Sequence, residues 1–234
     1  MLTAEEWSAL RLSFQVGAWA VIGSLPAALA LGYALARWSA SSRWFSQAAK
    51  WLVQVAIDLP LVLPPVVTGY LLLRLLVPNG PIGSYLQAWF GVRVLFTWPA
   101  AAIAAAVVSF PLMVRSIRLA FHAVDPRLEF AARSLGAGRL NAFLTISLPL
   151  ARRGVAAGCI LAFARSLGEF GATMMVLGSI EGQRTIPLAI YTLVYQPGGI
   201  ERSWRLVVIS IVLACGALAM SEWLERRQTL REEV

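Results

Sequence analysis

The sequence contains few charged residues. Only 14% of its 234 residues are Asp, Glu, Lys or Arg, whereas 59% are hydrophobic. Soluble globular domains carry about 25% charged residues, so this composition excludes an ordinary soluble domain and is typical of an integral membrane protein. The chain also has no internal repeat and no low-complexity tract. We therefore predict one all-α transmembrane domain that covers residues 1–234.

Residue types that usually carry catalysis or bind metals are also scarce. The chain has one histidine, His122, one lysine, Lys50, and two cysteines, Cys159 and Cys215, both in apolar runs. No metal-ligand spacing, no Ser/His or Cys/His pair and no G-x-x-x-x-G-K-[ST] phosphate loop is present. We predict a transport subunit that is not an enzyme and holds no cofactor or metal. Its energy is therefore expected to come from a partner.

The net charge of +8 comes largely from basic residues that lie beside apolar runs. Thirteen of the 20 basic residues form three clusters: Arg37/Arg43/Lys50, the stretch 115–153, and Arg226/Arg227/Arg231. This is the positive-inside pattern of membrane proteins, so nucleic-acid binding is not expected. The three clusters predict cytoplasmic segments, including the C-terminus. The acidic start, with Glu5 and Glu6, is expected outside.

Five apolar segments are long enough to cross a bilayer, which needs about 20 residues. They cover about 12–36, 51–77, 94–114, 154–180 and 206–224. An odd number of spans puts the two termini on opposite sides, in agreement with the charge bias. The segment 185–196 is too short to span. A six-span topology that crosses there would place the basic C-terminal cluster outside.

The second apolar segment is interrupted by Asp58 and by three prolines. Pro60, Pro64 and Pro65 each remove a helical hydrogen bond, so we predict that this helix is broken or sharply kinked. Broken backbone is tolerated at membrane depth where it faces protein or a watery cavity. This favours a place along a translocation path; a packed kink is the alternative.

The fourth apolar segment contains two charged residues. Charged groups at membrane depth cost about 2.5–3.5 kcal/mol on insertion scales and rarely face lipid. Arg165 and Glu169 are four residues apart and can meet on one helix face. Small and polar side chains form a stripe at the spacing i, i+4, i+7, i+11, which lies along one helix face: Ala162, Ser166, Glu169 and Thr173. We predict that this stripe lines a path or gate at a dimer interface, with Glu169 orienting Arg165; an ion pair that only fixes helix packing is the alternative.

Residues 125–149 form a polar, basic island between two apolar segments. Asp125 suits a helix N-cap and Pro126 suits the first helical position. Gly136 is the expected helix terminator, because glycine takes a positive φ without strain. A second short helix is expected over about 139–146. The sequence therefore predicts a helix–Gly–helix hairpin outside the bilayer, on the cytoplasmic side.

The hairpin carries a specific motif, E-x-A-A, then a glycine, then I-x-L-P. Its residues are Glu129, Ala131, Ala132, Gly136, Ile146, Leu148 and Pro149. The pattern resembles the signature loop of ABC-importer permease subunits, which implies that the loop docks into a cleft on a separate ATP-binding subunit and couples it to the membrane domain. Glu129 lies one turn before Arg133, so a weak local ion pair is also expected. A surface hairpin without a partner is the alternative.

Further segments are similar to the permease subunits of molybdate ABC transporters. They are 59–73, 79–83, 164–173 and 184–193. The resemblance implies a type I importer permease fold, a homodimer in the cell (inner) membrane, two cytoplasmic ATP-binding subunits, and an external binding protein that delivers molybdate or tungstate. Sulfate is the nearest alternative substrate. An ion-driven carrier or channel that conducts through Asp58, Arg165 and Glu169 is the alternative from another class.

Overall fold

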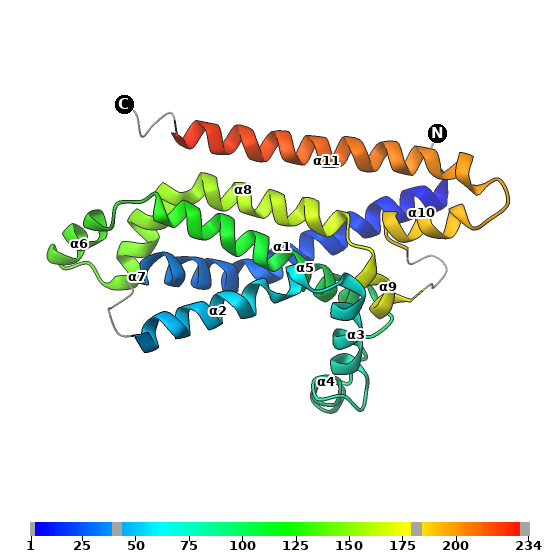
Figure 1. Ribbon diagram of the computed structural model, residues 1–234, viewed down its shortest axis with the longest axis horizontal. Coiled ribbons are helices and arrows are strands. Elements are labelled where there is room, and N and C mark those ends of the chain that lie inside the picture. The colour runs from blue at the N-terminus through cyan, green and yellow to red at the C-terminus, as the bar shows by residue number, and fades with distance from the viewer. Residues whose placement is uncertain (1–2, 39–43, 179–183, 230–234) are drawn as a thin grey trace. The chain divides into compact units, whose positions relative to one another are not determined.

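The computed structural model describes residues 3–38, 44–178 and 184–229, and the regular structure of this part of the chain is helical (Figure 1). The helices are α1 (Ala4–Arg37), α2 (Trp44–Val62), α3 (Pro65–Leu76), α4 (Gly83–Phe90), α5 (Trp98–His122), α6 (Pro126–Ser134), α7 (Arg139–Ala142), the π-helical turn η1 (Phe143–Ser147), α8 (Leu148–Leu167), α9 (Gly171–Leu177), α10 (Ile186–Val194) and α11 (Gly199–Thr229). The predicted all-α class is confirmed.

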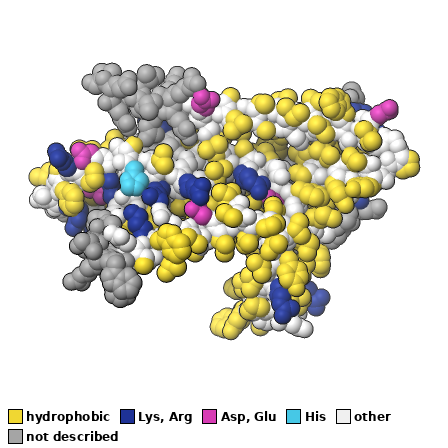
Figure 2. All heavy atoms as spheres, viewed as in Figure 1, with side chains coloured by type: hydrophobic (Ala, Val, Ile, Leu, Met, Phe, Trp, Pro, Cys, Tyr) yellow, Lys and Arg dark blue, Asp and Glu magenta, His cyan; other side chains and the backbone are white. Residues whose placement is uncertain are grey.

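Four helices in the described chain are long and apolar enough to cross a membrane: Ala4–Arg37, Trp98–His122, Arg139–Leu167 and Gly199–Leu224. A fifth span results if Gln47–Val62 and Pro65–Leu76, which are bent by 107° at their break, count as one. This agrees with the expected five segments and confirms that the second one is broken. The two prolines at the break explain the bend, because neither can donate a helical hydrogen bond. Hydrophobic side chains cover much of the face shown in Figure 2, as lipid contact requires.

Two predicted segments end elsewhere than expected. α5 continues past 114 to His122, because arginine ends an apolar stretch without ending a helix. The segment 154–180 is not a single helix: α8 ends at Leu167 and α9 begins at Gly171. The short segment after it forms α10, which is too short to cross a bilayer.

The chain divides into two compact units, which are described separately. The first comprises 1–23, 58–109 and 163–216, and the second comprises 24–57, 110–162 and 217–234. In the first unit, α3 and α9 cross with no room for a side chain between them: a Cβ added at Gly69 would lie 2.7 Å from Ala172 Cα. Alanines of α5 pack into the same core, and small residues of this kind allow close helix contact in membranes.

The core of the second unit supports the hairpin. Met113, Ile117 and Phe121 on α5 are fully buried. Phe121 packs against Tyr33 of α1 with ring centroids 5.3 Å apart, and Phe143 lies 4.9 Å from the same tyrosine ring. This aromatic cluster joins the end of α1, the end of α5 and η1 at the base of the hairpin.

Candidate functional site

The first arm of the hairpin folds as its sequence predicts. The Asp125 carboxylate accepts a hydrogen bond of 2.9 Å from the Arg127 amide, and Pro126 begins α6. After the helix, Gly136 has a φ of +94° and the Ala137 amide donates to the Ala132 carbonyl at 3.0 Å. These contacts satisfy donors at the start and acceptors at the end of α6.

The second arm differs from the prediction, because it is not a separate short helix. α7 passes through η1 directly into α8, and Arg139–Leu167 together form one span-length helical segment. Pro149 lacks the N–H that would bond the carbonyl four residues earlier, which explains why the helix widens into a π turn just before it. Ile146, Leu148 and Pro149 therefore lie where the hairpin becomes a membrane helix.

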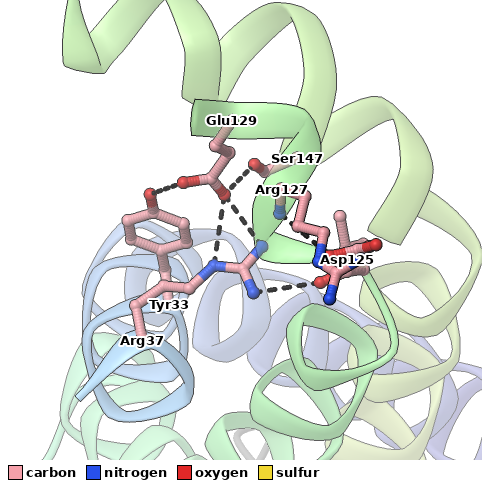
Figure 3. A network of polar contacts seen from close by, with 7 residues as sticks. Tyr33, Arg37, Asp125, Arg127, Glu129 and Ser147 are labelled. Atoms are coloured by element: carbon pink, nitrogen blue, oxygen red, sulfur yellow. Dashed lines mark hydrogen bonds and ion pairs between the residues drawn. The ribbon is translucent and has the colours of Figure 1, made fainter. Parts of the chain in front are cut away.

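Glu129 is the centre of a polar network that joins the hairpin to α1 (Figure 3). The Tyr33 hydroxyl donates to Glu129 Oε2 at 2.7 Å. The Arg37 guanidinium donates to Glu129 Oε1 through Nε at 3.2 Å and through Nη2 at 2.9 Å. The Ser147 hydroxyl donates to the same oxygen. The partners of this carboxylate come from α1 and η1, so the local pair with Arg133 expected from the sequence is wrong.

Arg37 also fixes the chain that leads into the hairpin. Its Nη1 donates to the Val124 carbonyl at 3.0 Å. The ion pair is shielded, with 17% of the Arg37 side chain and 14% of the Glu129 side chain exposed. Burial raises the pKa of Glu129, but hydrogen bonds from Ser147, Tyr33 and Arg37 and the charge of Arg37 outweigh it and hold that pKa below its usual value. The carboxylate is therefore charged at neutral pH.

The hairpin exposes several apolar side chains beside its exposed polar ones. The exposed residues are Leu128, Phe130, Leu135, Leu140 and Leu144, and Leu135 is 90% exposed. Among the motif residues, Ala131 is exposed and Ala132 is half-buried. An exposed apolar patch on a polar segment is typical of a protein-docking surface. The hairpin thus has one side anchored by the Glu129 network and one side available for a partner.

Arg165 and Glu169 do meet, but not on one continuous helix. Arg165 Nη1 lies 2.8 Å from Glu169 Oε2, and Glu169 Oε1 accepts a 3.0 Å hydrogen bond from the Ala172 amide at the start of α9. The Glu169 side chain is 2% exposed and that of Arg165 is 31% exposed. Ser166 and Thr173 are also buried, yet the break between α8 and α9 separates them. The ion pair is thus confirmed, and the uninterrupted stripe is wrong.

Two helix breaks in the first unit, at Pro64–Pro65 and before Gly171, lie against each other. A Cβ added at Gly171 would lie 2.9 Å from the Pro65 ring, so the bend after α2 and the break before α9 are adjacent. Pro64 and Pro65 are exposed, and Asp58 is half-buried on α2. Nearby in α3, Thr68 is buried and its hydroxyl has no hydrogen-bond partner among the described residues. Pro64 and Pro65 therefore lie at irregular backbone that packs against Gly171, and the Thr68 hydroxyl is an unpaired polar group in α3.

Three residues of the Glu129 network, Tyr33, Arg37 and Ser147, were not predicted from the sequence. Arg37 belongs to a basic cluster that indicated only membrane orientation, and Ser147 lies inside the I-x-L-P motif without a role. No spacing rule connects residues this far apart in the chain. Among the described residues, no group of His, Cys, Asp or Glu could hold a metal ion.

Comparison with known proteins gives a family and close relatives. Residues 28–230 match the family described as "Binding-protein-dependent transport system inner membrane component". The chain is 51% identical to the molybdenum transport system permease protein ModB of Escherichia coli K12, over 97% of this chain and 96% of that protein. It is 47% identical to ModB of Haemophilus influenzae, over 95% and 94% of the two chains. A putative molybdenum transport permease of Bacillus subtilis, YvgM, is 39% identical over 90% of each chain.

Solved structures share the fold at low sequence identity. A bacterial alginate ABC transporter in complex with an alginate-bound periplasmic protein aligns with a TM-score of 0.68 and 17% identity, over 95% of this chain and 77% of that chain. An amino acid ABC transporter with histidines aligns with a TM-score of 0.57 and 21% identity, over 95% and 94% of the two chains.

Proposed function

The chain belongs to the family of binding-protein-dependent transport system inner membrane components, and from this membership we propose that it is the membrane subunit through which an ATP-driven importer carries molybdate. The proposal that the substrate is molybdate rests on one observation, the 51% identity, over nearly the whole chain, with a molybdenum transport permease. Tungstate has the same charge and tetrahedral shape and is expected to share the path. Sulfate, a smaller tetrahedral dianion, is the alternative substrate, and an experiment must distinguish its transport from that of molybdate.

Substrate-stimulated ATP hydrolysis tests this proposal. The chain is reconstituted in vesicles with its ATP-binding subunits and its external binding protein, and hydrolysis is compared with molybdate, tungstate and sulfate. Molybdate and tungstate are expected to stimulate hydrolysis and to accumulate inside, and sulfate is not. If sulfate alone stimulates hydrolysis, the transported substrate is sulfate and the molybdate proposal is wrong. Uptake without ATP would indicate an ion-driven carrier.

The hairpin is the proposed coupling element. Two cytoplasmic ATP-binding subunits would each receive one hairpin from a homodimer of this chain. The exposed leucines and Phe130 supply the apolar contact that the core of such an interface needs. Behind them, the Glu129 network ties the hairpin to α1 and η1, so that motion of the partner reaches the membrane helices. The external binding protein would deliver the oxyanion to the opposite side.

The orientation that this coupling requires places the hairpin inside and the start of α1 outside. Ser134 is exposed on α6, and its hydroxyl donates to the Phe130 carbonyl of the same helix. In a chain without Cys159 and Cys215, Ser134→Cys is expected to resist a membrane-impermeant thiol reagent in intact cells and to react after permeabilisation. Ala4→Cys, at the exposed start of α1, is the matched control and should react in intact cells. The reverse pattern would overturn the orientation.

Arg165 is the proposed gate residue, positioned by Glu169. Arg165→Lys keeps the positive charge but loses the planar fork that meets the carboxylate. We expect a complex of wild-type stability that hydrolyses ATP yet transports about tenfold less molybdate per ATP. If the pair only fixes packing, transport and thermal stability will fall together. Wild-type stability with wild-type coupling would overturn the gate role.

A further inference from the structure

The first unit carries an open apolar groove of about 490 Å³ on α4. Apolar side chains line it: Pro81, Ile82, Tyr85, Leu86, Trp89 and Phe90. The aromatic ones are strongly exposed, and Trp89 is 80% exposed. Ile82, Tyr85 and Trp89 follow the spacing i, i+3, i+7, which places them on one helix face. With eight residues, α4 cannot cross a bilayer, yet it exposes a continuous apolar face.

Contacts within the unit hold α4 at the end of α3, where Figure 1 shows it. The Ile82 amide donates to the Leu75 carbonyl of α3 at 3.1 Å. Leu86 packs against a core that contains Leu76 and Leu95. Because α4 is fixed in this way, the groove is a preformed surface.

Two arginines near the groove have no partner in the described part of the chain. Arg74 lies in the last turn of α3, and Arg93 lines a small hollow together with Leu86 and Gln87 of α4. Both arginines are exposed, and neither makes a hydrogen bond or an ion pair with a described residue. The sequence contains no Asp or Glu from 59 to 124. Figure 2 shows basic side chains next to hydrophobic ones over α3 and α4, so this surface combines apolar area with uncompensated positive charge.

The chain that follows α4 is linked to the start of the apolar part of α1. The Phe96 amide donates to the Val176 carbonyl at 2.9 Å, and Leu177 packs in one core with Val16 of α1. Val16 lies four positions after the beginning of the apolar segment 12–36, which is about 6 Å at the helical rise of about 1.5 Å per residue. This part of the chain is therefore near the boundary between lipid headgroups and acyl chains, where Trp and Tyr are enriched.

We infer that α4 lies in this boundary and that its groove binds a phospholipid, with an acyl chain against the aromatic face and the phosphate paired with Arg93 and Arg74. A guanidinium group can meet a phosphate with two parallel hydrogen bonds. A second copy of the chain that used the same face would bring like charges together, which is unfavourable. The inference goes beyond the proposed function, because it requires a membrane and does not depend on the cargo.

Native mass spectrometry of the assembled transporter measures the dissociation constants of single bound lipids, here anionic phosphatidylglycerol and zwitterionic phosphatidylcholine. Arg93→Gln is expected to weaken phosphatidylglycerol binding about fivefold. It should weaken phosphatidylcholine less, because the choline group of that lipid already balances its phosphate. Trp89→Ser removes contact with the acyl chain and should weaken both lipids by a similar factor. Arg202→Gln is the matched control, because Arg202 is exposed on α11 and lines neither the groove nor the hollow.

A spin label on α4 separates lipid from water and from a protein partner. In a chain without Cys159 and Cys215, Ala88→Cys provides an exposed attachment site on α4. In the reconstituted transporter, the label is expected to be accessible to oxygen, which dissolves in lipid, and protected from a water-soluble nickel complex. Access of nickel would place α4 in water, and protection from both reagents would place it against protein. Either result would overturn the inference, as would an unchanged affinity of Arg93→Gln for phosphatidylglycerol.

Discussion

Replacing Glu129 by alanine is expected to reduce ATP-coupled molybdate transport by tenfold or more while the chain still inserts into the membrane. The substitution removes the acceptor of Tyr33, Arg37 and Ser147 at once. It also leaves the shielded Arg37 guanidinium without its carboxylate. Hydrogen bonds to charged groups contribute about 1.5–3 kcal/mol each, so the hairpin should lose its fixed position. Uptake per ATP hydrolysed by the reconstituted complex is the measurement.

A double-mutant cycle tests whether the ion pair carries this effect. Glu129→Gln keeps the shape of the side chain and one acceptor oxygen, and Arg37→Gln removes the opposite charge. If the pair acts as a unit, the double variant should lose much less transport than the sum of the two single effects. Tyr33→Phe, which deletes one hydroxyl, is expected to have the smallest effect. Additive losses, or normal coupling in Glu129→Ala, would show that the network does not position the hairpin.

Replacing Gly136 by valine is expected to have the second large effect. Gly136 has a φ of +94°, and an added Cβ would meet no atom within 4 Å, so any penalty comes from the backbone conformation alone. A β-branched residue in a sparsely populated region costs about 1–3 kcal/mol. The chain after α6 should shift to avoid this cost and turn the second arm away from its docking position. Transport and co-purification of the ATP-binding subunit should both fall.

Gly138 supplies a matched control two residues away. It has a φ of −67°, and an added Cβ there also meets no atom within 4 Å. Gly138→Val adds the same side chain to the same loop at an ordinary backbone angle, so it should retain most transport and subunit binding. Equal losses in the two variants would mean that the added bulk at the docking surface matters and the turn does not.

Local sequence signals were sufficient for most of the fold. The apolar segments followed from composition, since the cost of placing charged groups in lipid acts residue by residue. The proline pair predicted the break after α2, because proline always removes the same hydrogen bond. Asp125, Pro126 and Gly136 predicted the limits of the first hairpin helix, since capping involves neighbours within a few residues. The motif from Glu129 to Pro149 indicated the family, which the comparisons confirmed.

Tertiary structure alone decided what these residues contact. From the sequence, Glu129 had Arg133 one turn away, but such a helical pair is worth only about 0.2–0.5 kcal/mol. Folding brings Arg37 to the same carboxylate across 92 positions of the chain. Arg37 then makes two charge-assisted hydrogen bonds to Glu129, which together are stronger than the helical pair. The packing of Gly171 against Pro65 likewise depends on segments that meet only in the folded chain. Periodicity and capping rules describe neighbours in sequence, so they carry no information about these distant partners.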